Sequence, residues 1–315
     1  MGPSQQSLPL LSQISSSLYG GGGNNFAIVT AFTVRTFPQG PVYSRQVTYS
    51  DNQTETVLDA MYDLFTNPAL NSDKNMNYDM YYTFSAAQGF AMAGSQWYAG
   101  IEAGNASSNA ASVSPRVFSE LNAIPALNSM AQVQPMSRLV SGPPGQLGLV
   151  RHVFTTMTFR PNREVLSEGI EIFRQEINAI KDVPGLAPSF ICYPIWDAVI
   201  ERSTLNGGNA LGLAGEQSPL ILCFASTGWS NATDDRAVET MSENVINRVS
   251  AAAKAKGVYH PFKYINYASH AQAPSIYEGY GEENVRRLVE IQKKVDPEGI
   301  FTSKGLWNGY LKLPM

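Results

Sequence analysis

The amino-acid sequence predicts an α+β fold, in which helices pack on one side of a large antiparallel sheet. Several segments alternate polar and apolar residues and follow one another as hairpins, which is typical of antiparallel strands with one covered face. Between them lie long segments whose apolar residues recur every three or four positions, as in amphipathic helices. With 43% hydrophobic and 15% charged residues, the 315-residue chain can bury a large core.

The strands are predicted from runs rich in β-branched and aromatic residues that end near glycine or proline. They span residues 26–37, 42–49, 79–88, 90–102, 150–159, 189–195 and 220–226. Alternation gives the third strand two faces, one with Tyr78, Met80, Tyr82 and Phe84 and the other with Asp79, Tyr81 and Thr83. The first, aromatic face can be a pocket wall, although ordinary core aromatics give the same pattern.

Two long helices are the clearest elements. Residues 162–182 place Leu166, Ile170, Phe173, Ile177 and Ile180 on one face. Residues 234–256 carry a similar apolar stripe that ends at glycine. A further helix is expected from Asn52, whose side chain can cap it, to the residue before Pro68.

Composition and motifs exclude several classes of function. The net charge is −4 without a basic stripe, so nucleic acid is not an expected partner. No run of 18 apolar residues predicts a membrane span, and the first residues lack a signal-peptide pattern. The expected location is therefore cytoplasmic or undetermined. The sequons at Asn52, Asn105 and Asn231 would matter only in a secreted chain.

Metal binding and nucleophilic catalysis are not predicted. The three histidines have no His-x-x-x-His spacing, and no Cys-x-x-Cys or Gly-x-Ser-x-Gly motif is present. The two cysteines, Cys192 and Cys223, lie in apolar runs. They can be buried thiols or a bridge, and we expect buried thiols.

Three segments, in order along the chain, resemble one family of proteins. Residues 20–30, Gly-Gly-Gly-Gly-Asn-Asn-Phe-Ala-Ile-Val-Thr, are similar to a glycine-rich lead into a strand in berberine-bridge-enzyme-like, FAD-linked oxidases of the vanillyl-alcohol-oxidase type. Tyr264-x-Asn266-Tyr267 resembles the segment beside the flavin ring. Residues 280–301 resemble the family's closing helix and turn.

The resemblance implies a domain division. Residues 1–17 would be a flexible leader, 41–258 a substrate-binding domain whose sheet roofs the active site, and 18–40 with 259–315 the remnant of an FAD-binding domain. The family's phosphate-cradling loop and its flavin-attachment His and Cys match no segment of the chain. The chain therefore resembles a C-terminal half whose N-terminal flavin-binding half is missing, and we expect no bound cofactor.

The predicted site gathers residues from separate segments. The candidate catalytic residues are Tyr82, His152 and Tyr193, and the candidate substrate-binding residues are Gln96, Tyr98, Phe154, Tyr264 and Asn266. The resemblance adds Gly22, Gly23, Asn266 and Tyr267 as remnant cofactor contacts. His152 can act as a general acid or base, although a lone histidine on a strand is more often structural. We expect one sheet face to bear Tyr82, Tyr98, His152 and Tyr193, with Tyr264 and Asn266 at its floor.

Three functions fit this reading. The first is a flavin-independent cyclase or pericyclase, Diels-Alderase-like, that shapes a hydrophobic polyene or polyketide-like substrate for ring closure with Tyr and Gln hydrogen-bond donors. The second is an FAD-dependent oxidoreductase whose flavin half is lost or supplied by another chain. The third is a non-catalytic small-molecule-binding protein. Because the chain begins with methionine and a distinct Ser/Gln-rich leader, we expect the first.

Apolar surface is expected where the missing domain would pack. The strand at 26–37 and the helix at 285–295 carry apolar residues on more than one side. We therefore expect a homodimer or a partner chain to cover them. The alternative is that the leader, residues 1–17, folds back over this surface.

Overall fold

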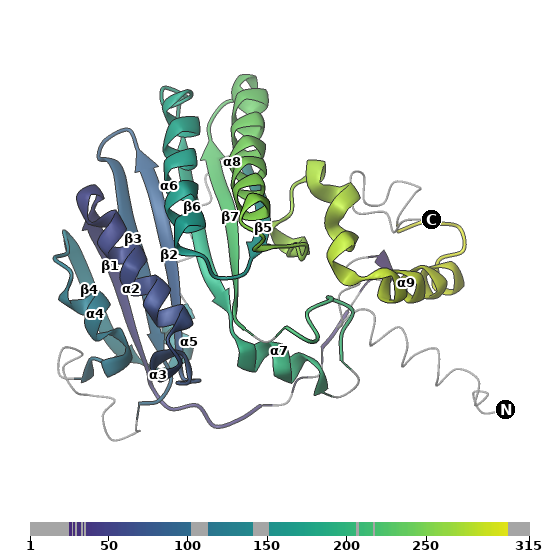
Figure 1. Ribbon diagram of the computed structural model, residues 1–315. Coiled ribbons are helices and arrows are strands. Elements are labelled where there is room, and N and C mark those ends of the chain that lie inside the picture. The colour runs from purple at the N-terminus through teal and green to yellow at the C-terminus, as the bar shows by residue number, and fades with distance from the viewer. Residues whose placement is uncertain are drawn as a thin grey trace.

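The structure, a computed structural model, describes residues 25–26, 28, 30–32, 34, 36–101, 113–140, 151–205, 208–216 and 218–301. Within these residues, eight strands form one antiparallel sheet in the order β4-β1-β3-β2-β6-β7-β5-β8 (Figure 1). The strands are β1 (Val42–Ser50), β2 (Met76–Ser85), β3 (Gly89–Tyr98), β4 (Asn128–Gln134), β5 (Arg151–Phe159), β6 (Ala187–Ile195), β7 (Leu220–Trp229) and β8 (Tyr259–His260). The predicted α+β fold is confirmed.

Three helices cover one face of this sheet, α2 (Thr54–Thr66), α6 (Arg163–Asn178) and α8 (Asp235–Ala255) (Figure 1). Each buries an apolar stripe against the strands, as its sequence period predicts. Asn162 starts α6 by accepting a hydrogen bond from the backbone N–H of Val165 at 3.0 Å. The cap predicted at Asn52 is wrong, because Asn52 lies inside a 3₁₀ turn that precedes α2.

The remaining helices lie outside this layer, and the last of them packs against the 3₁₀ segment that precedes it. They are α3 (Pro68–Asn71), α4 (Ser119–Ala123), α5 (Met136–Val140), α7 (Asp197–Ser203) and α9 (Glu282–Val295), with 3₁₀ segments η3 (Asp51–Gln53), η6 (Arg116–Phe118), η8 (Ala232–Asp234), η9 (Ile265–Tyr267) and η10 (His270–Tyr280). In the described part of the chain, no helix is long and apolar enough to cross a bilayer.

The two faces of the sheet differ in what covers them. The closed face packs against α2, α6 and α8 and includes Tyr78, Met80 and Tyr82 of β2, each fully buried. The opposite face, which these three helices do not cover and which we call the open face, bears the alternate residues of the same strands. It holds a second apolar cluster. Its buried members are Ile191, Ile200, Leu213, Leu220, Leu222, Phe224 and Phe262, and the rings packed against them are Tyr81, Phe154, Tyr193, Tyr264 and Tyr267.

The C-terminal segment is fastened to the edge of the sheet. The side chain of Gln272, in η10, accepts a hydrogen bond from the backbone N–H of Thr156 at 2.9 Å and donates one to its carbonyl at 2.7 Å. This amide thus takes the place of a neighbouring strand along part of β5.

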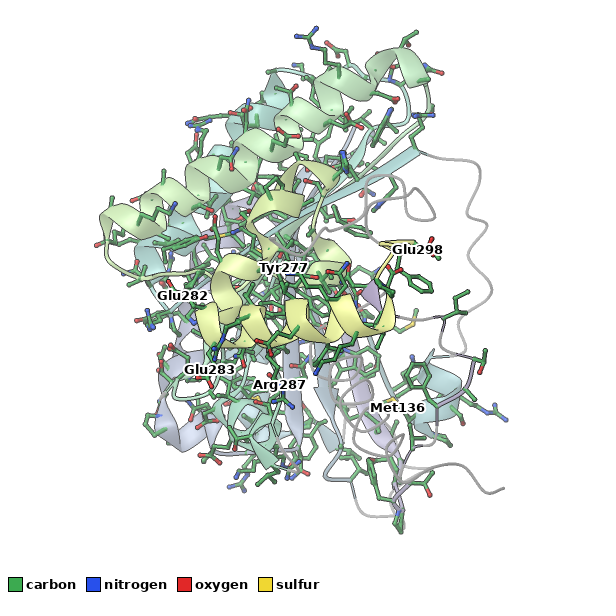
Figure 2. The ribbon with its side chains drawn as sticks, turned by 90° about the vertical axis from the view of Figure 1, so that its right-hand side faces the viewer. Met136, Tyr277, Glu282, Glu283, Arg287 and Glu298 are labelled. Atoms are coloured by element: carbon green, nitrogen blue, oxygen red, sulfur yellow. A yellow bond between two sulfur atoms is a disulfide. The ribbon has the colours of Figure 1, made fainter. Side chains whose placement is uncertain are left out.

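A third, small cluster joins the two ends of the described chain. Phe26 is buried with Ile276, Tyr277, Tyr280, Leu288 and Ile291. The side-chain amide of Asn25 donates a hydrogen bond to the hydroxyl of Tyr277 at 2.7 Å. Figure 2 shows α9 lying across the segment that carries Tyr277.

The proposed domain boundaries stay a prediction.

The strand predicted at 26–37 is not observed among the described residues of that segment. Ile28, Phe32, Val34 and Phe37 are instead 64–75% exposed. A strand needs a neighbour to satisfy its backbone, and β-propensity alone cannot supply one. The apolar side chains expected here are therefore exposed, but the described residues of the segment form no strand edge.

The cysteines also differ from expectation. Cys192 of β6 and Cys223 of β7 are both fully buried, as expected, but they form a disulfide. The strand register sets them directly opposite each other, with their Cα atoms 4.3 Å apart. Neighbouring residues in the sequence do not reveal this register, so buried thiols were the wrong prediction.

Candidate functional site on the open face

Tyr267 lies at the centre of an aromatic cluster on the open face. Its ring stacks on Phe224 of β7, with centroids 4.2 Å apart and planes 21° apart. Phe154 of β5 lies 5.5 Å from it, and Tyr264 meets it edge-on at 5.0 Å. Tyr193 of β6 in turn meets Phe224 edge-on at 6.2 Å. Offset and edge-on rings of this kind present flat, apolar surface with phenol groups at its border.

A tight turn brings the tyrosines to this face. The chain leaves β8 and enters the 3₁₀ turn η9, where the backbone N–H of Tyr267 donates to the carbonyl of Tyr264 at 2.9 Å. The exposed side chain of Asn266 donates to the hydroxyl of Tyr264 at 2.7 Å. The turn therefore ends the aromatic cluster in a polar edge made of one amide and one phenol.

His152 lies at the β5 side of the cluster. Its ring packs edge-on against Phe154 at 4.4 Å, and its Nε2 is 3.2 Å from the hydroxyl of Ser226. Burial lowers the pKa of His152 below its usual value, which favours a neutral imidazole. A neutral ring can exchange a proton with a ligand or simply hold Ser226 in place.

Asp79 of β2 borders the cluster on the opposite side. The side-chain amide of Asn77 donates to its Oδ1 at 3.0 Å, and the indole N–H of Trp196 donates to the Asn77 oxygen at 3.3 Å. Burial raises the pKa of Asp79 to about 6, against the lowering effect of hydrogen bonds from Asn77 and Trp97. Met80 pairs with Cys192, so one step along the antiparallel register sets Asp79 opposite Tyr193.

The tyrosines beside Asp79 keep their protons. Burial raises the pKa of Tyr193, and nearby Tyr267, Tyr264 and Asp79 raise it further. Burial also raises the pKa of Tyr81, with the charge of Asp79 as the next cause. Neutral phenols can donate hydrogen bonds to an oxygen of a ligand.

The structure divides the predicted site residues between the two faces. The open face and its polar edge bear His152, Phe154, Tyr193, Tyr264, Asn266 and Tyr267. The closed face bears Tyr82, Gln96 and Tyr98. The expectation of one shared face is therefore wrong. Gly22 and Gly23 lie outside the described residues.

Tyr82 and Gln96 have partners within the protein on the closed face. The Tyr82 hydroxyl donates to Asp51 at 2.6 Å, and its ring stacks on Phe90 at 5.7 Å. The amide of Gln96 donates to Asn122 at 2.8 Å. Helices cover this side of β2 and β3, because these strands put their larger apolar side chains there.

Sequence reasoning missed three residues of the open face, Asp79, Tyr81 and Phe224. It placed the first two on the correct strand and face but chose the opposite face as the pocket wall. An acidic residue inside an otherwise apolar strand was the available signal, since a buried carboxylate is unfavourable unless it has a function or a partner.

Comparisons with known proteins bear on this geometry. No family model matches the chain. Among solved structures, an aclacinomycin oxidoreductase matches 96% of this chain with 64% of its own length. The TM-score is 0.68 and the sequence identity is 15%. A berberine bridge enzyme variant covers 96% with a TM-score of 0.63 and 13% identity, over 62% of its length. The chain has the fold of berberine-bridge-enzyme-like, FAD-linked oxidases.

Relatives in sequence indicate which kind of protein the chain is similar to. The FAD-dependent monooxygenase FUP4 of Fusarium proliferatum is 30% identical over 89% of the chain and 54% of its own length. The FAD-dependent monooxygenase tpcD of Cochliobolus heterostrophus is 29% identical over 90% and 54%. A bifunctional solanapyrone synthase of Alternaria solani is 22% identical over 89% and 51%. The chain spans about half the length of these curated relatives.

The comparisons correct one expectation. We expected no cofactor, but FUP4 and tpcD are named FAD-dependent, and the solved structures that share the fold include an oxidoreductase and several oxidases. The similarity therefore points to FAD, and the expectation of a cofactor-free protein is wrong. The absence of a matching phosphate loop in this chain was a poor guide, because the matched region is only about half of each relative.

The described residues fit one end of FAD. A planar ring with a polar border matches the half-buried ring of Tyr267 and the exposed amide of Asn266 beside the Tyr264 hydroxyl. Asn266, Tyr264 and Tyr267 would therefore hold the ring end of the cofactor. The glycine-rich segment before Asn25 lies outside the described residues.

Proposed function

We propose that the chain is the substrate-binding part of an FAD-dependent oxidoreductase of natural-product biosynthesis. The observation that carries this proposal is the aromatic cluster on the open face, bordered by Asp79 on one side and the Asn266–Tyr264 pair on another. The similarity to FAD-dependent monooxygenases of fungi supports it. The substrate would be hydrophobic and aromatic or polyketide-like, because flat apolar surface with a few hydrogen-bonding groups selects such molecules.

The residues of the open face would have distinct roles. Phe154, which is half-buried and packs on Phe224 and Tyr267, would bind the flat part of the substrate. The protonated hydroxyl of Tyr193 would donate a hydrogen bond to a substrate oxygen and so fix its orientation. FAD, when bound, supplies the acceptor for two electrons from the substrate.

The remaining flavin-binding residues would come from elsewhere in the same polypeptide or from another chain. They would cover the exposed apolar side chains Ile28, Phe32, Val34 and Phe37. Pairing of two copies of this chain stays a further prediction, and light scattering on the purified protein tests it.

A second step, ring closure of the substrate or of its oxidised product, is a further candidate on the same face. The observation that favours it is the predominance of rings over charged groups there, because closing a polyene requires positioning and a few hydrogen-bond donors. One relative is named a bifunctional synthase, which is compatible with two steps at one site.

A chimera tests the main proposal. The half of FUP4 that matches this chain would be replaced by residues 18–315, and the purified protein examined for flavin absorbance. We expect a yellow protein with one FAD per chain. Asn266→Ala should weaken FAD binding roughly tenfold, as the loss of one good hydrogen bond does. The matched control, Asn244→Ala on the outer side of α8, should not. A folded, colourless chimera would contradict the proposal.

A further inference from the structure

Many acidic side chains of this structure form ion pairs, and Asp79 differs from them. No ion pair among the described residues includes it. Its side chain is half-buried, so it is reachable from the open face while protein atoms displace much of its water. Keeping a carboxylate in such surroundings without a cation reduces stability, which makes a functional explanation preferable.

The neighbours of Asp79 fix its orientation. Asn77 lies two residues earlier on the same strand face and holds Oδ1, while Trp196 holds Asn77 in turn. The register sets Tyr193 across from Asp79, so the carboxylate and the phenol border the same patch of open face. A substrate stacked on the aromatic cluster would lie beside both groups.

We propose that Asp79 is the proton acceptor for a hydroxyl group of the substrate bound on the open face. In this step the O–H bond breaks, its electron pair stays on the substrate oxygen, and the proton moves to a carboxylate oxygen of Asp79. Tyr193 keeps its own proton and donates a hydrogen bond to the anionic oxygen that forms. The inference rests on the proposed function, because it needs the open face to be the substrate wall.

The ionisation of Asp79 suits this role. Burial raises its pKa to about 6, so the group is ionised at neutral pH yet more basic than an exposed aspartate. The titratable groups that face it are Tyr81 on its own strand and Tyr193 on β6, and burial raises the pKa of both. Among these three groups, only Asp79 therefore changes its protonation near pH 6.

Two neutral probes that differ by one proton donor test the inference. 2-Naphthol carries a hydroxyl group, and 2-methoxynaphthalene has a methyl ether in its place. Their dissociation constants would be measured by fluorescence for the full chain at about pH 5 and about pH 8, where both probes remain uncharged. The variant is Asp79→Asn. The control is Asp59→Asn, which removes the same charge from the exposed side of α2.

We expect 2-naphthol to bind the wild-type chain about fivefold more tightly at the higher pH, because a hydrogen bond to a carboxylate is stronger than one to a carboxylic acid. Asp79→Asn should abolish this pH dependence, Asp59→Asn should keep it, and the methyl ether should show none. If both probes bind but 2-naphthol shows no pH dependence in wild type, or keeps it in Asp79→Asn, the inference is wrong and the binding face stands. If neither probe binds, the open face is not the substrate wall and the proposed function fails with it.

Discussion

The two faces of the sheet carry the same pair of residue types in opposite electrostatic settings. On the closed face, Asp51 accepts a hydrogen bond from Tyr82 at 2.6 Å and pairs with Arg174 at 2.9 and 3.0 Å. On the open face, Asp79 lies across from Tyr193, and no ion pair among the described residues includes it. Burial acts to raise the pKa of both acids. Hydrogen bonds from Arg174 and Tyr82 reverse this for Asp51, whose pKa is lowered, whereas the pKa of Asp79 stays raised at about 6.

The comparison shows that the neighbours, and not the residue type, decide what an Asp–Tyr pair does. Asp51 is ionised at neutral pH, because its pKa is lowered, and it joins α6 to the start of α2, so it contributes to stability. Asp79 can take up a proton near neutral pH, which is useful for chemistry and costs stability. Substitutions in the two pairs should therefore have different, and in part opposite, effects.

The largest expected effect is on the closed face. Tyr82 is fully buried and packs on Phe90 and Phe173, so Tyr82→Ala should lower the free energy of unfolding by about 4 kcal/mol. Tyr193 is only half-buried, and Tyr193→Ala should cost about 1 kcal/mol. Urea denaturation of both variants measures the two costs. Equal losses would mean that the open face is as important to folding as the closed face.

The sequence was sufficient for the general fold and for the alternation of β2. Amphipathic spacing located α6 and α8, and the period of two separated Tyr82 from Asp79 correctly. What the sequence did not show was which face the helices would cover. That choice depends on where α2 and α6 pack, which no local pattern in β2 reveals. Tyr82 was predicted to contact the substrate, but it is fully buried under the helices, and the face with Asp79 was passed over.

Other errors have the same origin in long-range structure. The disulfide depends on the register of β6 against β7, which brings Cys192 opposite Cys223. The segment at 26–37 has strand propensity, yet its described residues have no strand neighbour. In contrast, the Tyr264-x-Asn266-Tyr267 motif was recognised from residues adjacent in sequence, and the turn at η9 keeps those residues together.

A gain in stability is the second expected effect. An acid whose pKa is raised by folding contributes to the stability of the folded state when the pH is below its unfolded pKa. For Asp79 this contribution is lost as the pH rises through about 6. Asp79→Asn cannot ionise, so at about pH 8 it should be more stable than wild type by about 2 kcal/mol. The difference should shrink towards zero at about pH 4. Thermal and urea unfolding across this range measure it, and a destabilised variant at high pH would show that Asp79 has a cation that the structure lacks.

The smallest effect is expected at Asp51, with the opposite sign. Its lowered pKa means that its contribution is present above the unfolded pKa and lost as the pH falls through the folded one. Asp51→Asn should therefore cost about 1 kcal/mol at about pH 7, a modest value because the ion pair is partly exposed, with side chains 37% and 29% accessible. The cost should diminish in acid.

A double-mutant cycle with Arg174→Gln isolates the ion pair from the hydrogen bond of Tyr82. We expect a coupling of about 0.5–1 kcal/mol between Asp51 and Arg174 at neutral pH, reduced by added salt because the pair is partly exposed. The two acids lie on opposite faces of the sheet. Arg174→Gln should therefore leave unchanged the way in which the stability difference between Asp79→Asn and wild type varies with pH. If Arg174→Gln altered the titration of Asp79, the two faces would be electrostatically coupled, and the separate roles assigned to the two Asp–Tyr pairs would not hold.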